Sequence, residues 1–392
     1  MMQFKTLLKA ASFIVLCTSM LSANEEILSK QRLDLLDLNK QQIEQNSEKL
    51  SKDWINPITY KYIRSFGEQY DTAKSMVTIN QPIFRSGGIY QAIKYSSALE
   101  KYQYIDLETS RKALIKEATS FLYQIHKMNN TIEKQALLIK NSQIDIERKK
   151  EQVFNGLIDT SFLDNAILDA NIKKNALLDL QFQQKSLIHN FNSLSQTQYD
   201  KLELPRFDML SKDQFIQNNI YIQKTRANIE SKKWLSSMTV SKYLPTISFT
   251  YDYSKYHNTD NNPALMNEHN DTYGVNLTIP FDVRTFNDIK SSKIEKLKAQ
   301  KSLEIEKTEQ ENFMKIKLAK LDVLNKKVKI AQDDVKLYDS LLKQMDELLE
   351  AGLKTQSDVD TMENSLNIKY LDIKILDIEA QMELLELYSR LK

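Results

Sequence analysis

The sequence predicts a mostly α-helical protein with membrane β structure, in which long, internally duplicated coiled-coil hairpins are combined with four strands per chain. Three observations lead to this prediction. Segments rich in Lys, Glu, Leu and Gln, with apolar residues at heptad spacing, fill most of the chain. Four short segments instead alternate apolar and polar residues at period two, as half-buried strands do. Gly and Pro are scarce, with six of each in 392 residues, so the loops are few and the elements long.

The N-terminal residues have the layout of a secretory signal peptide. Two lysines precede an apolar run, and small residues close it at Ala23, so we expect residues 1–23 to be removed on export. The run is too short to remain as a membrane-spanning helix. The single cysteine, Cys17, lies in this run behind the bulky Leu16. Lipid attachment requires a small residue there, so we interpret Cys17 as part of the signal and expect a mature chain without thiols.

Charge and motifs exclude several classes of function. Removing the two lysines of the signal leaves 54 − 2 = 52 basic residues against 52 acidic ones, which gives no basis for nucleic-acid binding. The phosphate-loop, dinucleotide, zinc-protease and nucleophile-elbow motifs are absent from the sequence. We therefore expect no enzyme, no cofactor and no metal site. The loop predicted at 257–272 contains His257 and His269, but we expect an ordinary polar surface loop there.

The strands are predicted at four places. Their ranges are 58–66, 75–84, 246–256 and 272–281. In the third, "TISFTYDYSKY", one alternating set is apolar or aromatic and the other is polar. We expect the first set to face lipid, namely Ile247, Phe249, Tyr251 and Tyr253. We expect the second set to face water, namely Thr246, Ser248, Thr250 and Asp252.

The strand and helix signals occur twice at nearly one offset. The segments around Pro82 and Pro280 match at 198 residues, and those around Gly156 and Gly352 match at 196 residues. Two independent matches at one spacing indicate an internal repeat. Each repeat is expected to contain a helix, a pair of strands and a long helical hairpin that turns at its glycine. The predicted repeats are residues 24–204 and 205–392.

Four strands in one chain predict an oligomer. A membrane barrel needs at least about eight strands, and open strand edges in lipid cost several kcal/mol for each unpaired backbone group. Three chains would supply a closed barrel of about twelve strands. The run from Gly88 to Phe154 would extend about 100 Å if wholly helical, so it must pack along neighbouring helices of similar length. These arguments favour a homotrimer.

With these features the chain resembles the TolC family of trimeric outer-membrane efflux ducts. The most specific segments are "QPIF" with the glycines after it, "GLIDTSFLDNA" and "GLKTQSDVDTM". The resemblance implies a trimeric 12-stranded barrel in the cell outer membrane, in contact with its lipid, and a helical tunnel extending into the periplasm. It also implies a passive exit duct of a tripartite efflux or type I secretion system. The implied partners are a periplasmic adaptor (membrane fusion) protein and an inner-membrane pump of the RND or ABC type.

The resemblance also assigns roles to the two glycine turns. In the family the matching turns form the periplasmic tip that docks the adaptor. The residues carried over are Gly156, Leu157, Ile158, Gly352 and Leu353. The plainer alternative is that Gly156 and Gly352 only allow the backbone to reverse between two helices. The chain is shorter than expected for the family, so any equatorial girdle near Pro205 is expected to be reduced.

A periplasmic gate is the second implied site. The family places aspartates of the constriction six and nine residues after the second glycine. Asp358 matches the first position, whereas Thr361 occupies the second, so a second acidic ring must shift to Asp360 or be missing. Lys354 matches a basic position that helps to latch the closed end. The plainer alternative is that these charges only favour the start of a helix.

One alternative from a different class stays open on the sequence alone. A periplasmic or surface coiled-coil scaffold or adhesin would also have long heptad helices, with the strands in a small soluble sheet. Such a protein would have no pore. The sequence does not identify the exported substrate.

Overall fold

The computed structural model describes residues 27–68, 71–257 and 269–392. The predicted signal peptide with Cys17, and residues 258–268 of the predicted polar loop, lie outside the described residues. Two compact units make up the chain, and each combines segments from both halves of the sequence. Unit 1 contains the described residues up to Leu36 together with Thr109–Asn219 and Gln310–Lys392, and unit 2 contains Asp37–Glu108 and Ile220–Glu309.

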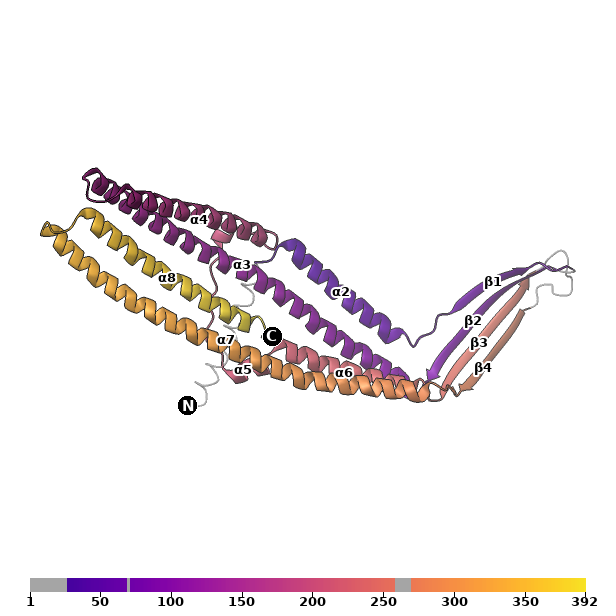
Figure 1. The fold of residues 1–392 in the computed structure, drawn as a ribbon. Coiled ribbons are helices and arrows are strands. Elements are labelled where there is room, and N and C mark those ends of the chain that lie inside the picture. The colour runs from indigo at the N-terminus through magenta and orange to yellow at the C-terminus, as the bar shows by residue number, and fades with distance from the viewer. Residues whose placement is uncertain (1–26, 69–70, 258–268) are drawn as a thin grey trace, which may run out of the picture. The chain divides into compact units, whose positions relative to one another are not determined.

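Helices dominate the described chain, and the predicted helix from Gly88 to Phe154 is confirmed as α3 (Figure 1). The elements are α2 (Lys30–Lys52), β1 (Thr59–Ser65), β2 (Thr72–Phe84), α3 (Gly88–Phe154), α4 (Thr160–Asn192), η1 (Tyr199–Lys201), α5 (Lys212–Gln217), α6 (Ile220–Ser241), β3 (Thr246–His257), β4 (His269–Thr278), α7 (Thr285–Glu350) and α8 (Gln356–Tyr388). The mostly α fold with four strands is thus confirmed.

The four strands form one antiparallel sheet in unit 2, in the order β1-β2-β3-β4. β4 lies three residues earlier than predicted, because its pairing with β3 runs from Lys255 opposite His269 to Thr246 opposite Thr278. The prediction of a loop over 257–272 is therefore wrong at both ends, since His257 ends β3 and His269 begins β4. Antiparallel backbone pairing continues through polar residues as readily as through apolar ones. The polar character of residues 257–272 was therefore not enough to locate the ends of β3 and β4.

The helices of unit 2 pack through small polar side chains. Ser47 of α2 lies 3.1 Å from Ser96 of α3, hydroxyl to hydroxyl, and donates a hydrogen bond of 2.8 Å to Glu100. At the start of α3, a Cβ on Gly88 would meet Ser241 of α6 at 3.0 Å. A side chain there would make a contact tighter than usual and push Ser241 aside, so glycine favours the close approach of these two helices.

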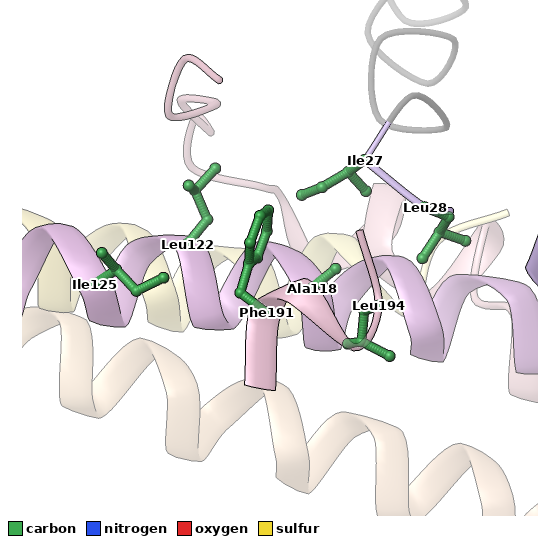
Figure 2. Close-up of a cluster of buried hydrophobic side chains, with 7 residues drawn as sticks. All are labelled: Ile27, Leu28, Ala118, Leu122, Ile125, Phe191 and Leu194. Carbon is green, nitrogen blue, oxygen red and sulfur yellow. The ribbon is translucent and has the colours of Figure 1, made fainter. Parts of the chain in front are cut away.

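Unit 1 contains α4, α8, the parts of α3 and α7 that pack along them, and the segments packed on these helices. Its first apolar cluster joins α3 to α4 and to the residues before α2 (Figure 2). The cluster comprises Ile27, Leu28, Ala118, Leu122, Ile125, Phe191 and Leu194. Ala118 and Ile125 are fully buried, and their spacing of seven residues is that of a helix face packed along a neighbouring helix. A second cluster joins α5 to α7 and α8 around the fully buried Phe215.

The segment around Pro205 is packed on α3 and α8. The Tyr123 hydroxyl of α3 donates a hydrogen bond to the Pro205 carbonyl. The Phe207 N–H donates to Gln381 of α8 at 2.8 Å, and Arg206 forms an ion pair with Asp377. The region where we expect a reduced girdle therefore has specific contacts to both hairpins.

Candidate functional site

The turn between α3 and α4 ends the first helix in a Schellman motif. The Gly156 N–H donates to the Val153 carbonyl at 2.9 Å, and the Leu157 N–H donates to the Gln152 carbonyl at 2.8 Å. Gly156 has φ +69°, a left-handed conformation that residues with a Cβ adopt at a cost. The local structure at the turn thus depends on glycine.

The turn between α7 and α8 repeats this geometry. The Gly352 N–H donates to Leu349 at 2.9 Å, the Leu353 N–H donates to Leu348 at 2.8 Å, and Gly352 has φ +72°. Both glycine positions are open, since no atom lies within 4 Å of where a Cβ would be. Backbone conformation, and not crowding, therefore selects glycine at both turns.

The two tips present large apolar side chains to the surroundings of the single chain. Leu157 is 72% exposed and Leu353 is 71% exposed, and Ile158 is half-buried. Phe154, the last residue of α3, is 92% exposed. Exposed apolar groups gathered at a hairpin end are typical of a binding surface.

Each second helix begins four residues after its glycine, and the residue before it is the N-cap. Asp159 caps α4 by accepting a hydrogen bond of 2.8 Å from the Ser161 N–H, and that bond lowers the pKa of Asp159. Thr355 is the corresponding residue before α8. The sequence match between the two segments thus corresponds to a match in the turn and in the position where the second helix begins.

Asp358 is held by two partners at the start of α8. Its Oδ2 accepts hydrogen bonds from the Thr355 N–H at 3.1 Å and the Thr355 hydroxyl at 3.0 Å. Its Oδ1 accepts a hydrogen bond of 2.7 Å from Arg148 of α3. The bond from the Thr355 backbone, and then the charges of Arg148 and Lys354, hold the pKa of Asp358 below its ordinary value. The carboxylate is therefore ionised and fixed in place.

The other residues of the predicted gate are not brought to Asp358 in one cluster. Asp360 accepts a hydrogen bond of 2.8 Å from Gln356, one turn earlier on α8. The Thr361 hydroxyl donates to the Ser357 carbonyl at 2.7 Å. Lys354 is exposed and acts on Asp358 through its charge. The sequence did not predict Arg148, which forms the direct ion pair.

Arg148 and Asp358 are the last rung of a polar ladder between α3 and α8. The ladder comprises Lys127–Glu379 at 2.6 Å, Lys134–Asp372 at 2.6 Å, Asn141–Ser365 at 3.4 Å and Arg148–Asp358 at 2.7 Å. Its positions are spaced seven residues apart on both helices, with every cation on α3 and every carboxylate on α8. This heptad pattern of opposite charges is present in the sequence and would have indicated the pairing.

The register of the sheet sorts its side chains into two faces, because residues directly opposite each other on neighbouring strands share a face. One face is apolar on β3 and β4, and its pairs are Ile247–Leu277, Phe249–Val275 and Tyr251–Tyr273. The other face is polar, and its pairs are Ser248–Asn276, Thr250–Gly274 and Asp252–Thr272. In the single chain Tyr273 is 77% and Val275 is 67% exposed. The apolar face is thus uncovered.

The described residues contain neither a membrane-spanning helix nor a cluster of metal-binding side chains. Helices in the described part of the chain include none that is long and apolar enough to cross a membrane. Residues 27–68, 71–257 and 269–392 contain no cluster of three or more His, Cys, Asp or Glu side chains suited to a metal ion.

Residues 212–370 match the family model described as outer membrane efflux protein. The match covers α5, α6, the second strand pair, α7, the turn at Gly352 and the first part of α8. No curated protein sequence matches the chain significantly.

Solved outer-membrane channels share the fold of this chain over nearly its whole length. The outer membrane protein VceC of Vibrio cholerae aligns with a TM-score of 0.72 at 11% identity, over 95% of this chain and 96% of VceC. The CmeC outer membrane channel of Campylobacter jejuni aligns with a TM-score of 0.73 at 12% identity, over 94% of this chain and 84% of CmeC. The MtrE outer membrane channel of Neisseria gonorrhoeae aligns with a TM-score of 0.63 at 10% identity, over 94% of this chain and 87% of MtrE. The predicted resemblance is confirmed for the fold over nearly the whole chain and by the family model over residues 212–370.

Proposed function

We propose that three copies of this chain form a passive exit duct in the outer membrane, each copy lending four strands to one barrel. The observation that carries the proposal is a sheet with one apolar face, which is uncovered, and one polar face. A closed barrel places the first face against lipid and the second around a water-filled lumen. Similarity to solved outer-membrane channels supports the same assignment.

Exposed apolar residues on the hairpins support assembly with further copies. On α7 four of them follow each other at intervals of seven residues and are 49–66% exposed. They are Ile316, Val323, Ile330 and Leu337. On α4, Leu168, Ile172 and Phe182 are 60–73% exposed. Heptad stripes of this kind are buried when another helix packs along them, and in the proposed trimer the neighbouring subunits supply those helices.

The tips and the acidic residues complete the proposal. Leu157 and Leu353, with the turns at Gly156 and Gly352, form the surface that docks the periplasmic adaptor of a tripartite efflux or type I secretion system. Asp358 forms the acidic ring of the periplasmic constriction. The sequence contains no nucleotide-binding motif, so an inner-membrane pump of the RND or ABC type supplies the energy.

Single-channel conductance in a planar bilayer tests the duct and its gate together. We expect the detergent-purified protein to insert as a trimer and give cation-preferring conductance. Asp358→Asn and Arg148→Gln both break the ion pair, but only the first removes the acidic ring. A fall in cation preference with Asp358→Asn alone supports Asp358 at the constriction, and Asp360→Asn is the matched control.

The same preparation distinguishes the duct from a scaffold without a pore. A scaffold or adhesin would stay soluble without detergent and give no conductance. A conducting protein whose cation preference is unchanged in Asp358→Asn would keep the duct and place its constriction elsewhere.

A further inference from the structure

Four basic residues lie on the apolar face of the sheet. They are at the end where loops join β1 to β2 and β3 to β4, opposite the end where the strands lead to helices. We call them the basic rim: Arg64, Lys255, His257 and His269. The register places Arg64 opposite Ala73, and Ala73 opposite His257. It likewise places Lys255 opposite His269. The strands bearing these residues end at the loops, away from the connections to α3, α6 and α7 (Figure 1).

The side chains of this face change in order along the strands. The basic rim is followed by tyrosines and then by aliphatic residues and phenylalanine. The tyrosines are Tyr60, Tyr62, Tyr251, Tyr253 and Tyr273, with Ile79 opposite Tyr251, and the apolar residues beyond them are Ile247, Phe249, Val275 and Leu277. From Lys255 to Ile247 the strand rises about 26 Å, or about 20 Å along the membrane normal at the tilt of barrel strands. The basic rim thus lies at the height of lipid headgroups when the apolar residues lie in the hydrocarbon.

The cations of the basic rim are available for a ligand. Arg64 is exposed and Lys255 half-buried, and neither forms an ion pair within the described part of the chain. The Arg64 guanidinium lies over the Phe66 ring at 4.9 Å, and stacking on a ring leaves its N–H groups free to donate. The strands carry one carboxylate on this face, Asp271, which lies near the Tyr251 hydroxyl at 3.4 Å.

His257 is held in place within the basic rim. Its Nε2 is 2.8 Å from the Ser75 hydroxyl, which also lies 3.1 Å from the Tyr60 hydroxyl. The His257 ring lies 5.8 Å from the ring of Tyr62. These contacts join side chains of β1, β2 and β3. They hold the His257 ring and the two hydroxyls in place between the strands that carry Arg64 and Lys255.

We propose that the basic rim binds the phosphate groups of anionic lipid headgroups in the leaflet at the loop end of the strands. The inference rests on the proposed duct, because it takes the apolar face as the lipid-facing one. Arg64 offers a planar fork of donors that matches a phosphate, and Lys255 adds a second charge. A cation at an anionic membrane surface strengthens association about fivefold. Two cations per subunit therefore favour an anionic lipid over a zwitterionic one by up to about 25-fold.

The test measures lipid selectivity of the full-length protein reconstituted in phosphatidylcholine vesicles. Electron paramagnetic resonance gives the fraction of a spin-labelled lipid that is motionally restricted by the protein. The ratio of association constants for spin-labelled phosphatidic acid and spin-labelled phosphatidylcholine is the readout. We expect a ratio well above one for the wild type and a fall towards one for the double variant Arg64→Gln/Lys255→Gln.

The opposite face of the sheet supplies a matched control. Lys61 lies opposite Met76, and Lys74 lies opposite Tyr256, so both belong to the polar face near the same end. Lys61→Gln/Lys74→Gln removes the same charge and should keep the wild-type ratio. An equal fall in both double variants, or in neither, would overturn the proposal.

Three further outcomes distinguish this proposal from its alternatives. Restriction of neither lipid would show that the protein is not inserted, which overturns the duct and the lipid site together. Restriction of both lipids with a wild-type ratio of one would keep the duct and overturn the lipid site. Binding of inorganic phosphate to the detergent-solubilised wild type, lost in Arg64→Gln/Lys255→Gln, would assign the basic rim to free phosphate and overturn its assignment to lipid.

Discussion

Arginine substitutions at two neighbouring residues of β3 test which face of the sheet meets lipid. Phe249 lies on the apolar face opposite Val275, and Thr250 lies on the polar face opposite Gly274. An arginine on the lipid face of a barrel costs about 2–4 kcal/mol at the bilayer midplane. Three subunits carry the change, so Phe249→Arg should destabilise the assembled barrel by about 6–12 kcal/mol. Thr250→Arg should cost little, because its charge lies in water.

The assay is the yield of heat-modifiable, detergent-resistant oligomer after folding into vesicles. A loss of 6–12 kcal/mol corresponds to at least about a 10⁴-fold change in the assembly equilibrium, so Phe249→Arg should leave no measurable oligomer. Thr250→Arg should assemble like the wild type, although it loses the weak hydrogen bond of 3.3 Å from its hydroxyl to Gly274. Equal yields for the two variants would refute the assignment of faces.

Three further predictions concern the hairpins. Gly352→Ala should lower the free energy of unfolding by about 1–2 kcal/mol, because its φ of +72° is left-handed; denaturant unfolding measures this, and Gly352→Asn should lose less. Arg148→Gln should raise the pKa of Asp358 in a carboxyl NMR titration, because Arg148 helps to lower it, and an unchanged pKa would contradict their coupling. Burial lowers the pKa of His126 from an ordinary value near 6.5, and its Nε2 has no hydrogen-bond partner in the described residues. The unfolded chain then binds the proton more readily, so stability should fall as the pH drops below about 6.5, and His126→Phe should remove this component of the pH dependence.

The strands and turns could be predicted because their signals are local. Alternation at period two identifies β3 from its own residues, and a glycine followed by an apolar residue identifies the left-handed turn at Gly156 or Gly352. The limits of β4 could not be predicted in this way. They depend on which residues of β3 its backbone pairs with, so the strand begins among the polar residues at His269 and ends at Thr278, before Pro280.

The partner of Asp358 could not be predicted from its neighbours in sequence. The sequence placed it correctly near the start of a helix, where a carboxylate at the third position bonds to the residue before the helix. Arg148 is 210 residues away, and only the antiparallel alignment of α3 with α8 brings the two together. The repeat identified the two hairpins but not the helices that pair between them.

The neutral rung of the α3–α8 ladder explains how this alignment is fixed. Asn141 meets Ser365, with 3.4 Å from its amide nitrogen to the hydroxyl, and also accepts a hydrogen bond of 2.9 Å from Asn364. A ladder of identical ion pairs could slip by one heptad and keep most of its contacts. With Asn141 in place, a slip in either direction sets the amide opposite a carboxylate and sets a cation opposite Ser365. Each half-exposed ion pair contributes only about 0–1 kcal/mol, so the ladder adds modest stability. Its larger effect is on register, because the slipped pairings lose ion pairs that the native pairing makes, and the native pairing is the one that holds Asp358 beside the turn at Gly352.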